Sequence, residues 1–187
     1  MSDVATTLKD AEIKMNKAIE VAKEDFAAIR TGRANPALFN KIMVDYYGTM
    51  TSLSQLASIQ VPEARMALIS PFDKGAMASI EKAIRDSDLG VNPGNDGVVI
   101  RVSFPQLTEE RRKEYIKMAK TKGEDAKIAI RNVRRAVKEA LEKLEKDGAI
   151  SKDDLARSEK ELEKHTGEHT SKIDELLKHK EAELLEV

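Results

Sequence analysis

The sequence predicts an α+β protein in which a helical domain is interrupted by a strand-rich one. In residues 4–29 and 107–185, apolar side chains recur at steps of three and four, which is the period of amphipathic helices. In residues 38–104 they alternate in twos and are punctuated by Gly and Pro, which is typical of strands and turns. The two helical segments must pack together, because an uncovered apolar stripe does not stabilise a helix by itself.

Local signals set the ends of the first two helices. The first runs from Val4 to Ile29, and we expect it to stop at Thr31-Gly32, where glycine can adopt the left-handed conformation that ends helices. The second begins behind Pro105 with Thr108 as its N-cap and ends near Gly148. Its expected core positions are Ala126, Ile130, Val133, Val137, Ala140 and Leu144.

A third helix opens at Ser151, which forms a capping-box pattern with Asp154. Leu155, Leu162, His169 and Leu176 follow at a spacing of seven. This spacing predicts long, nearly parallel helix packing.

The middle segment predicts a small α/β module. Its expected elements are strands at Ile42–Tyr46, Leu56–Val61, Met66–Ser70 and Val98–Phe104, and a helix at Ala76–Arg85. Asn95-Asp96-Gly97 predicts a turn before the last strand.

These elements divide the chain into a discontinuous helical bundle of residues 1–30 and 106–187 and an inserted domain of residues 31–105. Two linkers join them, near 30–33 and near 104–106. We expect the linkers to form a hinge, since domain motion is usual where an interface is small. The predicted hinge residues are Thr31, Gly32, Pro105 and Gln106.

The net charge of −1 hides a strong asymmetry. Residues 101–138 carry 12 Lys and Arg against 5 Asp and Glu, whereas residues 139–187 carry 9 against 15. The basic block favours an anionic partner, and the acidic block limits indiscriminate binding.

One face of the second helix carries most of this positive charge. The residues that share the face are Lys113, Lys117, Lys120, Lys127, Arg131, Arg134 and Lys138. Arg30, Arg33, Arg111 and Arg112 can extend it at the end nearest the linkers. A line of guanidinium groups suits a nucleic-acid backbone, because each fork matches phosphate geometry. The alternative is a solvated helix face, which the scarcity of acids argues against.

Catalytic and cofactor sites are poorly supported. Residues 90–97 are glycine-rich but match no nucleotide-binding pattern, so we expect a loop. His165 and His169 have metal-compatible spacing but no third ligand, and we expect His169 in the helix seam and no metal. Of Tyr46 and Tyr47, alternation sends one ring inward and one outward. No nucleophile and base can be assembled, so we expect no enzyme and no cofactor.

The chain has no Cys, no signal-peptide core at its start and no apolar run long enough to span a membrane. We therefore expect a soluble protein of the cytoplasm.

Several motifs resemble the bacterial ribosome recycling factor family, in order and across essentially the whole chain. They are Ile29-Arg30-Thr31-Gly32-Arg33-Ala34-Asn35-Pro36, Val44-Asp45-Tyr46-Tyr47-Gly48-Thr49, Gln55-Leu56-Ala57-Ser58-Ile59, Ser87-Asp88-Leu89-Gly90-Val91-Asn92-Pro93, Leu107-Thr108-Glu109-Glu110-Arg111-Arg112-Lys113 and Arg131-Asn132-Val133-Arg134-Arg135.

The resemblance implies an L-shaped monomer of roughly transfer-RNA outline, with a three-helix bundle and a smaller β/α/β domain. It implies a non-enzymatic factor that acts with elongation factor G and GTP on the post-termination ribosome, splitting it into subunits and releasing it from mRNA. The bundle would contact large-subunit ribosomal RNA at the tRNA sites. The positions that match the family's contacts are Arg30, Arg33, Arg111, Arg131 and Arg134. Lys127 and Lys138 join them on the basic face.

Two other classes combine similar features. A chaperone or nucleotide-exchange adaptor would dimerise through exposed heptads. A general nucleic-acid-binding protein would bind duplex DNA about as well as ribosomes.

Overall fold

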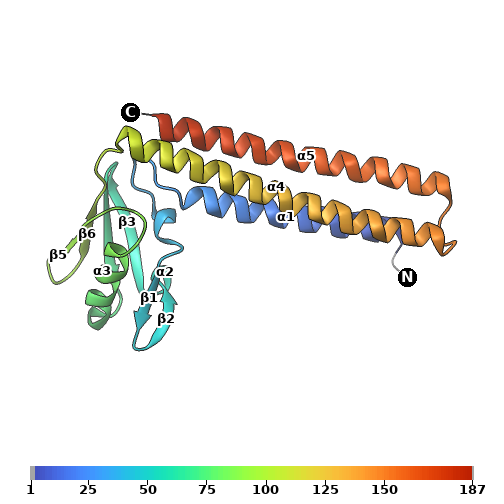
Figure 1. Ribbon diagram of the computed structural model, residues 1–187. Helices are drawn as coiled ribbons and strands as arrows, with labels where there is room; N and C mark the ends of the chain where they lie inside the picture. The colour runs from blue at the N-terminus through green and yellow to red at the C-terminus, as the bar shows by residue number, and fades with distance from the viewer. Residues whose placement is uncertain (1–2, 187) are drawn as a thin grey trace. The chain divides into compact units, whose positions relative to one another are not determined.

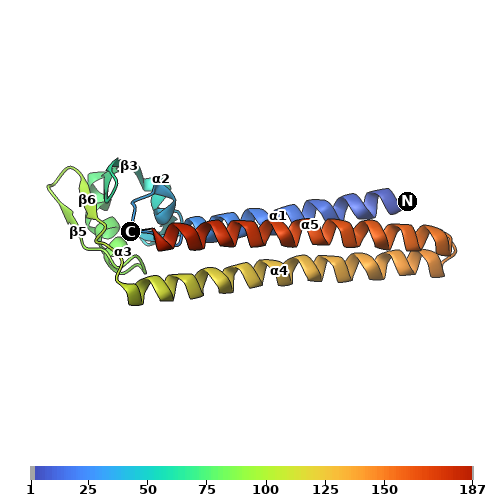
Figure 2. The same ribbon diagram turned by 90° about the horizontal axis from the view of Figure 1, so that it is seen from above.

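The computed structural model describes residues 3–186. The fold is α+β, with three long helices and a small strand-rich part (Figure 1). The long helices are α1 (Val4–Ala27), α4 (Glu109–Lys146) and α5 (Lys152–Leu185). Figures 1 and 2 together show them running alongside one another. No helix within residues 3–186 is both long enough and apolar enough to cross a membrane.

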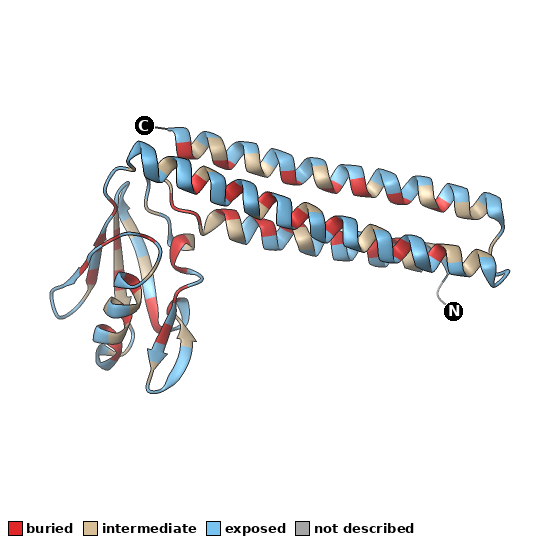
Figure 3. Cartoon of the chain, in the orientation of Figure 1, coloured by how far each residue is buried: buried red, intermediate tan, exposed pale blue. Residues whose placement is uncertain are grey.

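Buried positions recur along the length of each long helix (Figure 3). Fully buried members of the bundle core include Ala11 and Met15 of α1, Ile130 and Leu141 of α4, and Leu162 and Ile173 of α5. The prediction for Ala140 was wrong: Ala140 is exposed and Leu141 occupies the core position. The step of four from Val137 to Leu141 explains the shift, because it keeps both residues on one face.

The predicted N-caps of α4 and α5 are confirmed. Arg111 N donates to Thr108 Oγ1 at 3.1 Å. Asp154 N donates to Ser151 Oγ at 3.0 Å, and Ser151 N donates back to the Asp154 carboxylate at 3.4 Å. These bonds satisfy backbone donors that have no partner inside the helix. They also hold the pKa of Asp154 below its ordinary value.

The end of α1 differs from the expectation. The helix stops at Ala27, and Gly32 is not among the residues with positive φ. Ile29 and Arg30 are both only 4% exposed, so the chain leaves the helix early to bury these two side chains. Tertiary burial therefore overrides the local glycine signal.

The strand-rich part contains two antiparallel sheets. A hairpin pairs β1 (Met43–Tyr46) with β2 (Thr49–Ser52). The larger sheet has the order β3-β4-β6-β5. Its strands are β3 (Ala57–Glu63), β4 (Met66–Pro71), β5 (Pro93–Asn95) and β6 (Ile100–Ser103). The helical elements of this part are α2 (Leu53–Leu56), α3 (Met77–Arg85) and two short 3-10 turns, Pro36–Phe39 and Lys74–Ala76.

All four predicted strands and the predicted helix are present, and the turn at Asn95-Asp96-Gly97 joins β5 to β6. Two strands and one α-helix were missed, as were the two 3-10 turns. β2 is exposed or half-exposed throughout, so it has no apolar alternation to detect. β5 contains Pro and Gly, which strands generally avoid, and α2 is only 4 residues long.

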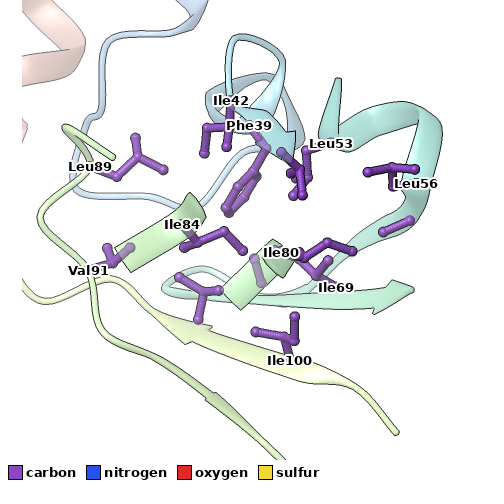
Figure 4. Close-up of a cluster of buried hydrophobic side chains, with 14 of the residues drawn as sticks. Phe39, Ile42, Leu53, Leu56, Ile69, Ile80, Ile84, Leu89, Val91 and Ile100 are labelled. Carbon is purple, nitrogen blue, oxygen red and sulfur yellow. The ribbon is translucent and has the colours of Figure 1, made fainter. Parts of the chain in front are cut away.

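One apolar core holds the strand-rich part together (Figure 4). Phe39 is fully buried and packs edge to face against Phe104, with ring centroids 6.1 Å apart. Ile80 and Ile84 of α3 and Ile69 of β4 are also fully buried. This core gives the strand-rich part a stabilising centre of its own.

Contacts divide the chain into two compact units. One contains the chain up to Phe26 together with Lys117–Glu181. The other contains Ala27–Ile116 together with the chain from Ala182 onward, so it includes the first turns of α4 as well as the strand-rich part.

Candidate nucleic-acid interface

The basic face of α4 keeps the regularity that its spacing predicts. Helix α4 runs unbroken for 38 residues, from Glu109 to Lys146, so it presents the stripe along a straight line about 57 Å long. Arg131 and Lys138 are exposed, and Lys127 and Arg134 are half-buried. Lys113, Lys117 and Lys120 are exposed as well. The face is therefore accessible to a polyanion.

Several cations of this face already have acidic neighbours. Arg134 donates to Glu163 of α5 at 3.0 Å, and Lys127 pairs with Asp174 of the same helix. Arg131 pairs with Glu124 at 3.2 Å. Exposed ion pairs contribute about 0–1 kcal/mol, so phosphate groups can compete for these guanidinium and ammonium groups. The acids orient the cations without neutralising the whole face, since Lys120 and Lys138 have no ion pair within residues 3–186.

Arg30 lies in different surroundings from the α4 cations. It is 4% exposed, its Nη1 donates to Leu89 O at 3.3 Å, and its Nη2 donates to Pro105 O. The guanidinium carbon lies 5.3 Å from the centroid of the Phe104 ring. Burial lowers the pKa of the Arg30 guanidinium; Tyr115 opposes this shift and the charge of Arg111 adds to it.

The other predicted residues at this end of α4 are closer to solvent. Arg111 is exposed and lies against Gly90: a Cβ placed on Gly90 would be 3.0 Å from Arg111 Nη1. Arg33 is exposed, and its backbone N–H donates to Thr31 Oγ1 at 3.2 Å. Arg112 is half-buried. Of the predicted hinge residues, Thr31 and Gly32 are half-buried, and Pro105 and Gln106 are exposed.

Tyr46 is half-buried and Tyr47 is 76% exposed, but the predicted separation of the two rings was wrong, because their centroids lie only 4.6 Å apart and β1 ends at Tyr46. No sequence pattern indicates the partner that both rings share, which is Asp73. Its carboxylate accepts from the Tyr46 hydroxyl at 2.9 Å and from the Tyr47 hydroxyl at 3.2 Å. The hydrogen bond that the Tyr46 hydroxyl donates to Asp73 raises the pKa of Tyr46, and the Asp73 charge raises the pKa of Tyr47. Tyr47 adopts a positive φ of 48°, which is rare for a residue with a side chain.

His165 and His169 both lie on α5. His169 is 8% exposed and lies in the seam, with Nδ1 2.6 Å from His165 O and Nε2 2.8 Å from Asn16 Oδ1 of α1. Both ring nitrogens therefore have a polar partner within the bundle. In the part of the chain that the structure describes, no group of three or more His, Cys, Asp or Glu side chains could hold a metal ion.

Comparison with known proteins gives one consistent result. The family model described as "Ribosome recycling factor" matches residues 22–185. The chain is 66% identical over 184 residues to the ribosome-recycling factor of Streptomyces avermitilis, covering 98% of this chain and 100% of the relative. It is 64% identical over 187 residues to that of Cutibacterium acnes, covering 100% of each.

Solved structures agree. A solution structure of the ribosome recycling factor superimposes with a TM-score of 0.76 at 41% identity, over 100% of both chains. A second match has a TM-score of 0.68 at 40% identity and covers 99% of this chain and 100% of the other. It comes from models of the T. thermophilus ribosome recycling factor and the E. coli elongation factor G bound to the E. coli post-termination complex. The chain belongs to the ribosome recycling factor family.

Proposed function

We propose that this protein recycles ribosomes at the end of protein synthesis. It binds the post-termination ribosome and, with elongation factor G and GTP, promotes dissociation into subunits and release from mRNA. The observation that carries the proposal is the full-length match to the family, at 66% identity over 98% of the chain for one relative. The chain itself is a translation factor and not an enzyme, because GTP hydrolysis belongs to elongation factor G.

The basic face of α4 is the proposed ribosome-binding surface. Lys127, Arg131, Arg134 and Lys138 line it. Arg111, in the first turn of the same helix, and Arg33, in the loop after α1, are proposed as further contacts. We assign these residues to phosphate groups of large-subunit ribosomal RNA at the tRNA sites, because guanidinium forks bind phosphate bidentately. Such contacts position a protein on RNA without reading its sequence. Arg30 belongs to the same predicted set, but its burial favours the different role argued below.

The mechanical part of the proposal rests on the predicted division of the chain into a bundle of residues 1–30 and 106–187 and a domain of residues 31–105. Phosphate contacts hold the bundle on RNA while elongation factor G drives the smaller domain about the linkers near 30–33 and 104–106. Two chain crossings permit bending without unfolding either core. We propose that the protein acts as a monomer.

The test is breakdown of purified post-termination ribosomes into subunits, followed by light scattering. The arms are this protein alone, this protein with elongation factor G and GTP, and the same mixture with Arg134→Ala. Arg85→Ala is the matched control, since Arg85 is also a helical arginine ion-paired to an acid, Glu81, at 3.0 Å. Splitting that needs both proteins, is impaired by Arg134→Ala and is unaffected by Arg85→Ala supports the proposal. No splitting by the wild-type protein with active partners contradicts it.

A second arm separates this function from general nucleic-acid binding. Duplex DNA of matched charge is titrated at the same salt concentration as ribosomes. Weaker binding to DNA supports a ribosome-specific factor, whereas equal binding would reduce the α4 face to a general polyanion surface.

A further inference from the structure

Arg30 connects three segments that are far apart in the sequence. It follows α1 in the chain, and it donates to Leu89 O in the loop after α3 and to Pro105 O just before α4. Its guanidinium also lies over the Phe104 ring, 5.3 Å from the centroid. All of these residues belong to the same compact unit. One side chain thus links the segment after α1, the α3–β5 loop and the segment before α4.

The acceptors of Arg30 are fixed by the core of that unit. Leu89 is 6% exposed, and its side chain packs in the core cluster drawn in Figure 4. Phe104 is 1% exposed, packs against Phe39, and its N–H donates to Arg65 O at 2.8 Å. An arginine suits this place, because its rigid fork can donate to two carbonyls while its flat face stacks on a ring.

Within the described part of the chain, no acid is among the groups that shift the pKa of Arg30. The charged or ionisable groups that act on it are Tyr115 and Arg111, and neither is a carboxylate. Arg111 lies at the solvent side, against Gly90, whereas Arg30 points inward to carbonyl oxygens. Burying a cation costs free energy, so we infer that the hydrogen bonds of Arg30 have a structural role that offsets this cost. A buried side chain that is already bonded is poorly placed to grip an external phosphate.

We propose that Arg30 is a positioning residue that fastens the two linkers to each other and to the Leu89 loop, so that they move as one unit during recycling. This inference rests on the proposed function. Without the fastening, each linker bends independently and force applied to the smaller domain is not transmitted to the bundle. Arg30 therefore affects the rate of splitting and not the affinity for the ribosome.

The test separates binding from turnover. Ribosome affinity and the splitting rate at saturating protein are measured for Arg30→Ala and Arg30→Lys, with Arg134→Ala as the ribosome-contact comparator and Arg85→Ala as the neutral control. Arg30→Lys keeps the charge but loses the fork, and it remains available if Arg30→Ala does not fold. For either Arg30 variant we expect the Kd to stay within about twofold and the maximum splitting rate to fall about fivefold or more.

Two results would overturn the assignment. One is an Arg30 variant that weakens binding as Arg134→Ala does and regains the full rate at high concentration, which is the behaviour of a ribosome contact. The other is an Arg30→Lys protein with wild-type affinity and wild-type rate.

Hydrogen exchange gives a readout that does not depend on the ribosome. In Arg30→Lys we expect faster exchange in peptides covering 89–91 and 104–107, and no change there in Arg134→Ala. If exchange in Arg30→Lys is unchanged, Arg30 does not hold the linkers together, whether or not the wild-type protein splits ribosomes. If the wild-type protein fails to split ribosomes but exchange changes as expected, only the proposed function is refuted.

Discussion

The guanidinium of Arg134 in α4 donates a hydrogen bond of 3.0 Å to the carboxylate of Glu163 in α5. The two side chains are 40% and 57% exposed, so water screens the pair and its net contribution to stability is small. A residue proposed to bind phosphate is thus held in place by an acid that an RNA phosphate would have to displace.

Removing that acid should strengthen ribosome binding. We expect Glu163→Gln to lower the ribosome Kd by about two- to fivefold while changing the free energy of unfolding by less than about 1 kcal/mol. Equilibrium binding at fixed salt measures the effect. Glu168→Gln, an equal charge change at another exposed position of α5, serves as the control. Weaker binding by Glu163→Gln alone would show that Glu163 orients Arg134 rather than competing for it.

The buried polar contact in the bundle should have a measurable cost when truncated. Asn16→Ala leaves Nε2 of the buried His169 without its partner at 2.8 Å, so we expect a loss of about 1–2 kcal/mol in urea denaturation. Lys17→Ala, at the next exposed position of α1, should change stability by less than about 0.5 kcal/mol. Equal stability of the two variants would argue against a role for the His169–Asn16 contact.

Both the backbone conformation at position 90 and the nearby Arg111 side chain favour glycine there. Its φ is +65°, and a Cβ would lie 3.0 Å from Arg111 Nη1. We expect Gly90→Ala to destabilise the protein by about 1–2 kcal/mol, since a side chain is strained at positive φ. Gly94→Ala is the control, because nothing lies within 4 Å of its Cβ position. Thermal melts of the two variants measure the difference in stability. A Gly90→Ala protein as stable as Gly94→Ala would refute the expectation.

Asp73 should govern the titration of the two tyrosines. Its hydrogen bonds and charge raise the pKa of Tyr46 and of Tyr47 above the ordinary value. In Asp73→Asn both phenols should therefore ionise at lower pH, which the ultraviolet absorbance of tyrosinate detects. Asp45→Asn makes the same charge change next to the pair, where Asp45 accepts from Gly48 N, and it tests for a general charge effect. A titration curve unaltered by Asp73→Asn would contradict the contact.

The cap of α5 should make stability depend on pH in acid. The side chain and backbone of Ser151 hold the pKa of Asp154 below its ordinary value of 3.8. The folded state then favours the charged carboxylate, so the stabilisation is complete above that value and is lost as pH falls through the lower folded pKa. Wild type should be more stable than Asp154→Asn at neutral pH, and the gap should shrink in strong acid. A gap that stays constant as the pH falls would exclude the carboxylate as its source.

Much of the fold could be predicted because it depends on periodicity. The three long helices follow from apolar steps of three and four, and their N-caps from local residue types at Thr108 and Ser151. The early end of α1 at Ala27 could not be predicted, because the burial of Ile29 and Arg30 decides it. β5 escaped detection for a related reason: pairing with β6 makes a strand of Pro93–Asn95 despite its composition.

The candidate site could likewise be predicted only in part. The alignment of cations along α4 follows from spacing within one helix, so the sequence predicts it. Which acids approach them, such as Glu163 and Asp174 of α5, depends on the packing of two helices. The inward position of Arg30 likewise depends on contacts with Leu89 and Pro105, which lie 59 and 75 residues away in the chain.

The most direct test of the central claim is the affinity of this protein for ribosomes, measured over a range of salt concentrations for wild type and for the double variant Arg131→Ala/Arg134→Ala. If the basic face of α4 binds ribosomal RNA, the affinity of the variant should be about tenfold or more lower than that of wild type. Its affinity should also depend less steeply on salt, and its melting curve should match that of wild type. Wild-type affinity and an unchanged salt slope would contradict the claim that this face binds the ribosome.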